Sequence, residues 1–173
     1  TPFDLIDIEK SVKADFPIHS TKDFYTTIGG RIDRLDCKDG CIRVIDYKTG
    51  TKVSSANSVD DFFVSNDKHT DYYLQTFLYS IIVSNDKKAN PAELPVSPAL
   101  LFIQHISKDE YDPTLKFGNE LIADVRVYAD DYMEQLNKVI TEIFDQSKPF
   151  TACDNSKTCS FCPYRKLCGH DEK

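Results

Sequence analysis

The chain has 173 residues, a formal net charge of −7 and a hydrophobic content of 40%. This length suits one domain with a real hydrophobic core. A domain that binds DNA tightly on its own is usually basic, so the acidic balance counts against that class. It does not count against a site that concentrates carboxylates, or against a module of a larger basic assembly. No stretch has the length and apolar character of a membrane span, and no signal peptide pattern is present, so we expect a cytoplasmic protein.

The N-terminal segment is strand-like over residues 3–16 and includes the acidic residue Glu9. The chain begins with Thr1-Pro2 and no initiator Met. We therefore expect it to be a fragment of a longer polypeptide.

Residues 30–50, GRIDRLDCKDGCIRVIDYKTG, predict two strands joined by a tight turn. Asp39-Gly40 is the strongest turn signal in this segment. Because side chains alternate along a strand, Asp46 and Lys48 share one face of the second strand with its apolar residues. That face begins apolar and ends in a carboxylate and an amine.

Pairing of the two strands across the turn is expected to bring Asp33 near Asp46. Two carboxylates and a lysine at one end of a sheet suit a Mg²⁺ or Mn²⁺ site for phosphodiester hydrolysis. In this hypothesis Asp33 and Asp46 bind the metal, the Tyr47 carbonyl is a further ligand, and Lys48 serves the attacking water. The alternative is an exposed ion pair beside an ordinary turn aspartate.

Residues 69–84 predict a helix in which Tyr72, Gln75 and Tyr79 share a face at three- and four-residue spacing. One interpretation is a core helix whose polar groups find local partners. The other is that Gln75 and Tyr79 reach the metal site or a DNA backbone.

The second half of the chain predicts further core elements. Residues 99–106, ALLFIQHI, indicate a central strand covered on both faces, and residues 120–128 a further short strand. A second amphipathic helix is predicted over residues 130–146, with Asp130 as its N-cap. Its predicted buried stripe comprises Met133, Leu136, Val139, Ile140, Ile143 and Phe144.

The C-terminal tail is rich in cysteine. Dense cysteines with a Cys-Pro step favour metal ligation over disulfides in a cytosolic protein. The alternative is a set of unligated thiols in a short surface tail. Cys37 and Cys41 flank the hairpin turn, where a structural role is expected. The candidate ligands in the tail are Cys153, Cys159, Cys162 and Cys168.

Three segments in this order, GRIDRLD, IDYKTG and LQTFLYS, resemble the RecB-like branch of the PD-(D/E)XK nuclease superfamily. The resemblance implies that Asp33 is the metal-binding residue of the first motif. It implies that Asp46 and Lys48 form the D-x-K pair, and that Gln75 and Tyr79 form the Q-x-x-x-Y helix motif.

The resemblance spans residues 3–168 and implies an α/β, restriction-endonuclease-like core, in which a mixed central sheet is flanked by helices. In this family a helix usually precedes the first strand and often carries a histidine ligand, and the chain offers no candidate for it. Glu9 matches an acidic position that the family often carries, which implies a supporting role. Arg31 or Arg34 is expected to hold a phosphate, since arginine forks match phosphate oxygens.

AddB-like nuclease subunits and CRISPR-associated RecB-like exonucleases end in C-x2-C-x5-C, which Cys159, Cys162 and Cys168 match. There the three cysteines hold a [4Fe–4S] cluster with a fourth cysteine upstream of the nuclease motifs. In this chain the upstream cysteine is missing, and Cys153 is its candidate replacement. Zinc is the alternative metal, because thiolates suit both.

We therefore expect a RecB-like nuclease core over residues 1–150 and a metal-binding tail over residues 151–173. The expected activity is a Mg²⁺- or Mn²⁺-dependent deoxyribonuclease, an exonuclease rather than an endonuclease. The expected partners are DNA, the rest of the parent chain and a helicase subunit that processes double-strand ends. The alternatives are a catalytically silent DNA-binding or subunit-interaction domain, and a metal-cluster interaction module.

Overall fold

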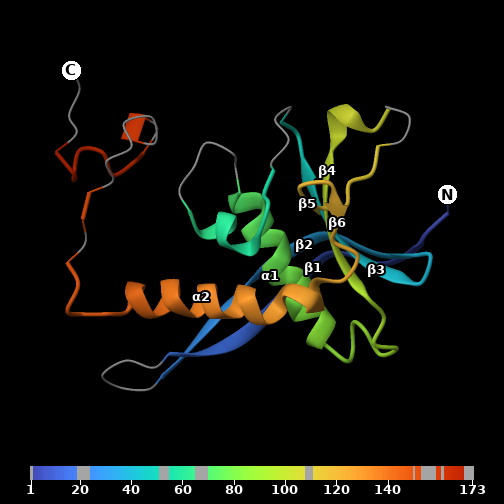
Figure 1. Cartoon of the computed structure of the whole chain (residues 1–173), viewed down its shortest axis with the longest axis horizontal. Helices are drawn as coiled ribbons and strands as arrows, with labels where there is room; N and C mark the ends of the chain where they lie inside the picture. The colour runs from blue at the N-terminus through green and yellow to red at the C-terminus, as the bar shows by residue number, and fades with distance from the viewer. Residues whose placement is uncertain are drawn as a thin grey trace.

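The computed structural model describes most of the chain, with a sheet, two main helices and short connecting elements (Figure 1). The described residues are 2–18, 24–50, 55–64, 70–107, 111–149, 151–152, 159–160 and 162–169. The strands and α-helices are β1 (Asp4–Ile18), β2 (Phe24–Lys38), β3 (Cys41–Lys48), α1 (Asp71–Asn85), β4 (Val96–Phe102), β5 (Lys116–Phe117), β6 (Glu120–Leu121) and α2 (Ala129–Ile143). Short 3₁₀ helices are η1 (Val59–Phe63), η2 (Ile103–His105) and η3 (Val125–Tyr128). Among the described residues, no helix has the length and apolar character needed to cross a membrane.

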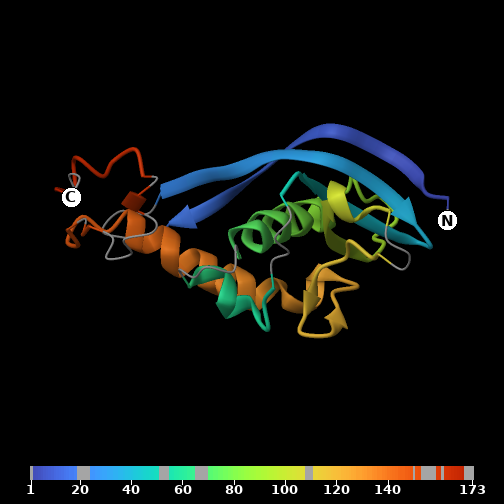
Figure 2. The same cartoon turned by 90° about the horizontal axis from the view of Figure 1, so that it is seen from above.

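Strands β1 to β4 form one mixed sheet in that order. The β1–β2 and β2–β3 pairs are antiparallel, and the β3–β4 pair is parallel. Helix α1 lies in the crossover connection that a parallel pair requires. Figure 2 shows β1 and β2 arching over α1, with α2 on the same side of the sheet. The predicted fold class, an α/β domain with a mixed sheet and packed helices, is confirmed.

The predicted turn between β2 and β3 is also confirmed. Asp39 and Gly40 have φ angles of 52° and 76°, so both lie in the left-handed region. A two-residue hairpin turn of type I′ requires positive φ at both central positions, which Asp-Gly tolerates well. The turn fixes the pairing of Lys38 with Cys41, and with it the register of the two strands that carry the candidate site.

An aromatic cluster joins the second helix to the core. The ring of Phe77 in α1 stacks on Tyr132 of α2 at 5.9 Å and meets Phe62 of η1 edge-on at 4.8 Å. Tyr132 is fully buried and donates its hydroxyl to the carbonyl of Leu74 at 2.9 Å. Burial raises the pKa of Tyr132, so its hydroxyl stays protonated as a donor.

The structure corrects the predicted second helix, residues 130–146. Helix α2 ends earlier, at Ile143, and Tyr128 occupies the N-cap position, while Asp130 lies in the first turn. Val139, Ile143 and Phe144 are exposed rather than buried, because α2 rests on the core along one narrow side only. The α2 residues that are buried are Tyr132, Leu136 and Ile140.

The structure also corrects the predicted central strand, residues 99–106. Strand β4 begins three residues earlier and gives way to η2 after Phe102, and it is last in the sheet order. Its continuous burial has another source, since Thr114 pairs with Ala99 and so covers the edge of β4. Residues 120–128, predicted as one strand, hold the two-residue β6 and the 3₁₀ helix η3.

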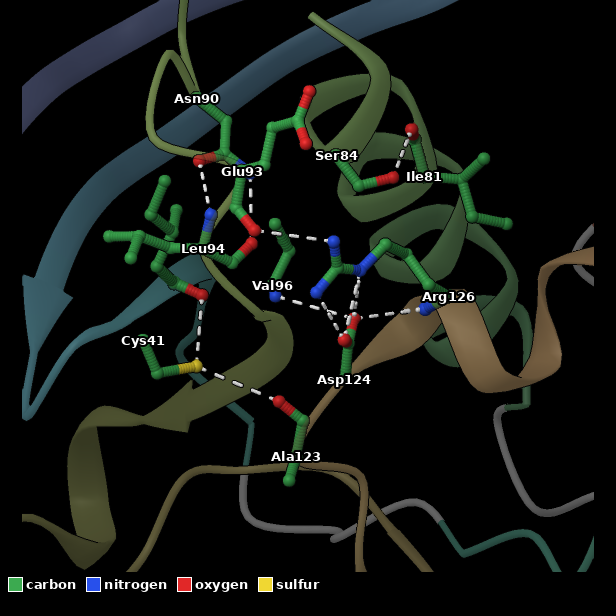
Figure 3. A network of polar contacts seen from close by, with 11 residues as sticks. Cys41, Ile81, Ser84, Asn90, Glu93, Leu94, Val96, Ala123, Asp124 and Arg126 are labelled. Atoms are coloured by element: carbon green, nitrogen blue, oxygen red, sulfur yellow. Dashed lines mark hydrogen bonds and ion pairs between the residues drawn. The ribbon is translucent and has the colours of Figure 1, made fainter.

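A polar network anchors the start of β4 (Figure 3). The Asp124 carboxylate accepts hydrogen bonds from the backbone N–H of Val96 at 3.5 Å and of Arg126 at 3.1 Å. Arg126 also pairs with Asp124 through its side chain, at 2.6 Å, and donates to the carbonyl of Glu93 at 3.3 Å. The segment before α2 is thereby tied to the loop that leads into β4.

Cys41 belongs to the edge of the same network. Its Sγ donates to the carbonyl of Ala123 at 3.6 Å, as Figure 3 shows. Burial raises the pKa of the Cys41 thiol, and the nearby Asp124 carboxylate acts in the same direction. A thiol with a raised pKa is a poor nucleophile and a poor metal ligand. These contacts support the structural role expected for Cys41.

On the sheet face opposite the helices, Asp36 is fully buried between two arginines. The Arg43 guanidinium binds the Asp36 carboxylate bidentately, with Nε 2.7 Å from Oδ1 and Nη2 2.9 Å from Oδ2. Arg34 lies on its other side, with Nε 2.9 Å from Oδ2. The Phe3 ring covers both guanidinium groups, at 4.8 Å from Arg34 and 5.7 Å from Arg43. This ion cluster, Asp36–Arg34–Arg43, ties β2 to β3 beneath the candidate site.

We predict that Asp36→Ala lowers the free energy of unfolding by about 3–5 kcal/mol, because it strands two poorly solvated guanidinium groups. Urea unfolding measures the change. The matched control is Glu134→Ala, which breaks the exposed pair with Lys138 and is expected to cost at most about 1 kcal/mol. Equal costs for the two variants would contradict a structural role for the cluster.

Helix α1 approaches β2 closely at Gly30. A Cβ built on Gly30 would meet the hydroxyl oxygen of Tyr79 at 1.9 Å and its ring carbon Cζ at 2.6 Å. Tyr79 is itself buried, so its ring has little room to move aside. The glycine is therefore the residue that lets Tyr79 lie against the strand.

We expect Gly30→Ala to lower the free energy of unfolding by about 1–3 kcal/mol through overpacking. Gly50→Ala is the control, since a Cβ there meets nothing within 4 Å, and a change within about 0.5 kcal/mol is expected. Chemical denaturation of both variants tests this. A Gly30→Ala variant as stable as the wild type would show that Tyr79 shifts without cost.

Candidate active site

At the candidate site, the regular alternation of side chains along β2 between the two faces of the sheet is interrupted. Ile32 and Leu35 are both buried in the same core, although residues three apart in a regular strand face opposite sides. The paired residues on either side are Ile8 with Arg34 and Lys10 with Ile32, so the ladder skips one pair between them. The skipped position holds Asp33, which the irregularity sets apart from the regular alternation.

Glu9 is the β1 residue at the skipped position and has a positive φ of 53°. A non-glycine residue in the left-handed region carries local strain, and such strain concentrates at functional sites. The Glu9 carboxylate pairs with Arg31 Nη1 at 2.9 Å, and both side chains are more than half exposed. Glu9 therefore borders the site on its solvent side.

Asp33 is held at the end of the β2–β3 ladder. The last pair in that ladder is Arg34 with Ile45. One step further, Asp33 Oδ2 accepts a hydrogen bond from the backbone N–H of Tyr47 at 2.7 Å. The carboxylate thus replaces the backbone partner that β3 loses there, which fixes the direction of Asp33.

Asp46 lies inside this end of the sheet and is 8% exposed. Lys48 Nζ is 2.6 Å from Asp46 Oδ2, yet this buried oxygen has no partner with hydrogen-bond geometry. The two groups therefore form an ion pair that is poorly aligned as a hydrogen bond, and a hydrogen bond weakens steeply when it is misaligned. Asp46 therefore keeps an oxygen available for a further positive ligand.

The electrostatics of Asp46 point to the same need. Burial raises the pKa of its carboxyl above the ordinary 3.8, Lys48 acts in the opposite direction, and the Asp33 carboxylate raises it further. Asp33 lies beside this carboxyl in the structure, since the Asp33 carboxylate binds the backbone N–H of Tyr47, the residue after Asp46. A bound cation would favour the ionised form of both.

Lys48 completes this group from the neighbouring position on β3. Its Nζ lies 4.2 Å from the centre of the Tyr72 ring on α1, and its side chain is 17% exposed. An ammonium over an aromatic face is held by the ring quadrupole. Tyr72 is a site residue that the sequence predictions missed, although its three-residue spacing from Gln75 was a usable signal.

Gln75 and Tyr79 meet each other rather than the carboxylates. Gln75 Nε2 donates to the Tyr79 hydroxyl at 3.2 Å, and that hydroxyl lies against Gly30. Among the described residues no contact joins this pair to Asp33 or Asp46. In the structure the pair packs α1 onto β2, three residues before Asp33.

Of the two arginines considered for phosphate binding, Arg34 is committed elsewhere. It pairs with Asp36 and donates through Nη1 to the Tyr47 hydroxyl at 3.1 Å. Arg34 thereby supports the residue whose backbone N–H holds Asp33. Arg31 is 65% exposed and pairs with Glu9, so its guanidinium remains accessible to solvent beside Asp33.

The donor set fits a hard divalent cation such as Mg²⁺ or Mn²⁺. Mg²⁺ is commonly bound by one or two carboxylates and keeps several waters. Asp33 and Asp46 supply two carboxylates, and Asp46 Oδ2 makes no well-aligned hydrogen bond that a metal would have to displace. In the part of the chain that the structure describes, no three His, Cys, Asp or Glu side chains gather as a metal cage. Such a cage is not required for a water-rich Mg²⁺ site.

The cysteine tail is described only in part. Cys153 lies outside the described residues. Cys159 and Cys162 are joined by a turn, with the N–H of Cys162 donating to the carbonyl of Cys159 at 3.1 Å. Cys168 is exposed and unoxidised.

We predict that the free energy of unfolding of the metal-free chain depends on pH in part through the titration of Asp46. Because the pKa of Asp46 is raised in the folded state, its contribution is fully present below the unfolded value. That contribution is lost as the pH rises through the raised pKa. The free energy of unfolding of the wild type, minus that of Asp46→Asn, is therefore expected to fall across this range, as measured by urea unfolding in chelator.

Asp7→Asn is the control for this titration, because its pKa is lowered by the hydrogen bond from Lys10. For Asp7 the stabilising contribution is present above the unfolded pKa and lost as the pH falls, so the slope has the opposite sign. The same slope for both variants would refute the assignment to Asp46.

The comparisons with known proteins bear on the whole chain. The model of the PD-(D/E)XK nuclease superfamily matches residues 1–169. Comparisons with curated proteins and with solved structures gave no match. The family match covers both carboxylates, the D-x-K lysine and the helix motif on the fold described above. The chain belongs to the PD-(D/E)XK nuclease superfamily.

Proposed function

We propose that this domain is a DNA nuclease that uses Mg²⁺ or Mn²⁺ to hydrolyse phosphodiester bonds. The observation that carries the proposal is the buried Asp46 carboxylate beside Asp33, because its Oδ2 has an ion pair with Lys48 at 2.6 Å but no well-aligned hydrogen bond. An ordinary surface ion pair has no such oxygen, because water would satisfy it. Membership of the nuclease superfamily supports the same reading.

Each residue has a role in this proposal. Asp33 and Asp46 hold the metal, and the Tyr47 carbonyl adds an oxygen. When bound, the metal supplies polarisation of the phosphate and activation of water. Lys48, steadied by Tyr72, orients the attacking water or offsets the charge that develops on the phosphate.

The outer residues position the substrate and the site. Arg31 meets a flanking phosphate and is held by Glu9. Gln75 and Tyr79 set the distance between α1 and β2.

The wider context of the proposal rests on the resemblance of the three motifs to RecB-like nucleases. We propose that the domain is part of a longer AddB-like chain, in the cytoplasm, that works with a helicase on double-strand ends in recombinational repair. Digestion from ends, as an exonuclease, fits this setting. The tail cysteines Cys159, Cys162 and Cys168, with Cys153 or a cysteine outside this chain, would hold an iron–sulfur cluster or zinc.

The decisive test is cleavage of linear and of closed circular DNA by the full chain with Mg²⁺ or Mn²⁺. We predict that Asp46→Asn and Lys48→Ala each reduce the rate by about 10²–10³-fold or more. Linear DNA is expected to be degraded and circular DNA to be spared. The matched control is Asp39→Asn, an exposed turn position where asparagine also accepts positive φ.

The competing function is a silent domain that binds DNA or a partner without cutting. It is favoured if the wild type binds Mn²⁺ in calorimetry, loses that binding in Asp46→Asn, and yet cleaves no substrate. Cleavage that persists unchanged in Asp46→Asn would refute the assigned site.

A further inference from the structure

A hollow in the protein surface lies beside the candidate site, on the same face of the sheet. It has a volume of about 530 Å³. Two strand residues of its lining, Leu100 and Phe102, pair in register with Asp46 and Lys48. Because paired residues in a sheet share a face, the hollow lies one strand away from the candidate carboxylate and lysine. Tyr73, which follows the Lys48 contact Tyr72 on α1, forms another wall.

The walls of the hollow are held by hydrogen bonds. The Tyr111 hydroxyl accepts from the backbone N–H of Phe102 at 2.9 Å and donates to the carbonyl of Leu100 at 3.0 Å. The Tyr73 hydroxyl donates to the carbonyl of Lys116 at 3.2 Å. Gln104 Nε2 donates to the Thr49 carbonyl at 3.0 Å, which fixes η2 to the end of β3. A wall set in this way costs little ordering entropy when a ligand enters.

The lining chemistry is aromatic with a polar rim. His105 lies against Phe102, with ring centres 5.9 Å apart, and edge-on to Tyr111 at the same distance. The hollow thus has three rings on one side. Its volume falls within the range of small-molecule sites, which are mostly apolar with a few polar groups. The polar side chains of the lining come from Ser55, Asn57, Asp112, Thr114 and Lys116, so one carboxylate and one ammonium group border the hollow.

We propose that this hollow, the base pocket, receives a nucleobase of the substrate strand next to the phosphate held at Asp33 and Asp46. The proposal rests on the proposed nuclease function for its orientation. Bases stack on aromatic side chains regardless of sequence, and histidine and tyrosine are common stacking partners. A paired base inside a duplex is not free to enter, so the pocket takes a base from a single-stranded end.

The test is fluorescence anisotropy with a labelled single-stranded oligonucleotide, in Ca²⁺ without Mg²⁺ or Mn²⁺, on the full chain. His105→Ala is expected to weaken binding about 5- to 150-fold, the size of one lost base stack. His105→Phe, which keeps a flat ring, is expected to restore it, and this rescue excludes misfolding as the cause. Tyr25→Ala is the control, since Tyr25 is an exposed aromatic residue outside the pocket.

A second probe is the same strand with abasic sites in place of bases. The wild type is expected to bind it as weakly as His105→Ala binds the intact strand. Equal affinity of the wild type for both strands, an unchanged His105→Ala variant, or no binding by the wild type would each overturn the base pocket.

The same assay separates the two proposals. If Asp46→Asn abolishes cleavage but keeps base-dependent binding, both proposals stand. If the wild type binds in the base-dependent manner without ever cleaving, the nuclease function fails and the pocket stands. If cleavage depends on Asp46 while His105→Ala changes neither binding nor rate, the pocket fails and the nuclease stands.

Discussion

The hydrogen bond from the Tyr47 N–H to the Asp33 carboxylate is the contact on which the site depends. It fixes one carboxylate where the β2–β3 ladder ends, within β2, while β3 continues far enough to place Asp46 and Lys48. On the opposite face, the buried cluster of Asp36 with two arginines holds the same strands together. Buried ion pairs therefore hold the strands around the site, while Asp46 Oδ2 within it has an ion pair with Lys48 but no well-aligned hydrogen bond.

The strands around the site are thus held by polar contacts, while the carboxylates within the site still favour a further positive charge. Burial and the Asp33 carboxylate both raise the pKa of Asp46, so the ionised form that binds a metal is costly in its absence. Lys48 offsets part of that cost but is also held over Tyr72. A cation that binds both carboxylates would relieve the remainder, which couples metal binding to the stability of this end of the sheet.

The sequence was sufficient for the hairpin, the D-x-K face and both helices, because turn chemistry and residue periodicity act locally. It was insufficient where tertiary packing decides. The interruption of side-chain alternation in β2 beside Asp33 depends on Glu9, a residue distant in sequence. No alternation rule predicts it. The sequence of β4 has the apolar pattern of a central strand because Thr114 covers its edge. The partnership of Tyr72 with Lys48 follows from how α1 crosses β3.

The acidic balance of the chain limits how it can hold a polyanion. Affinity for nucleic acid normally comes from lysine and arginine contacts that release counterions. Here Arg34 and Arg43 are engaged by Asp36, and Arg31 is paired with Glu9. In the two proposals a substrate strand is held by the metal at the scissile phosphate, by Arg31 at a flanking phosphate and by stacking in the base pocket. These contacts all act close to the reacting bond, so under the two proposals the chain would hold a strand where it cuts it.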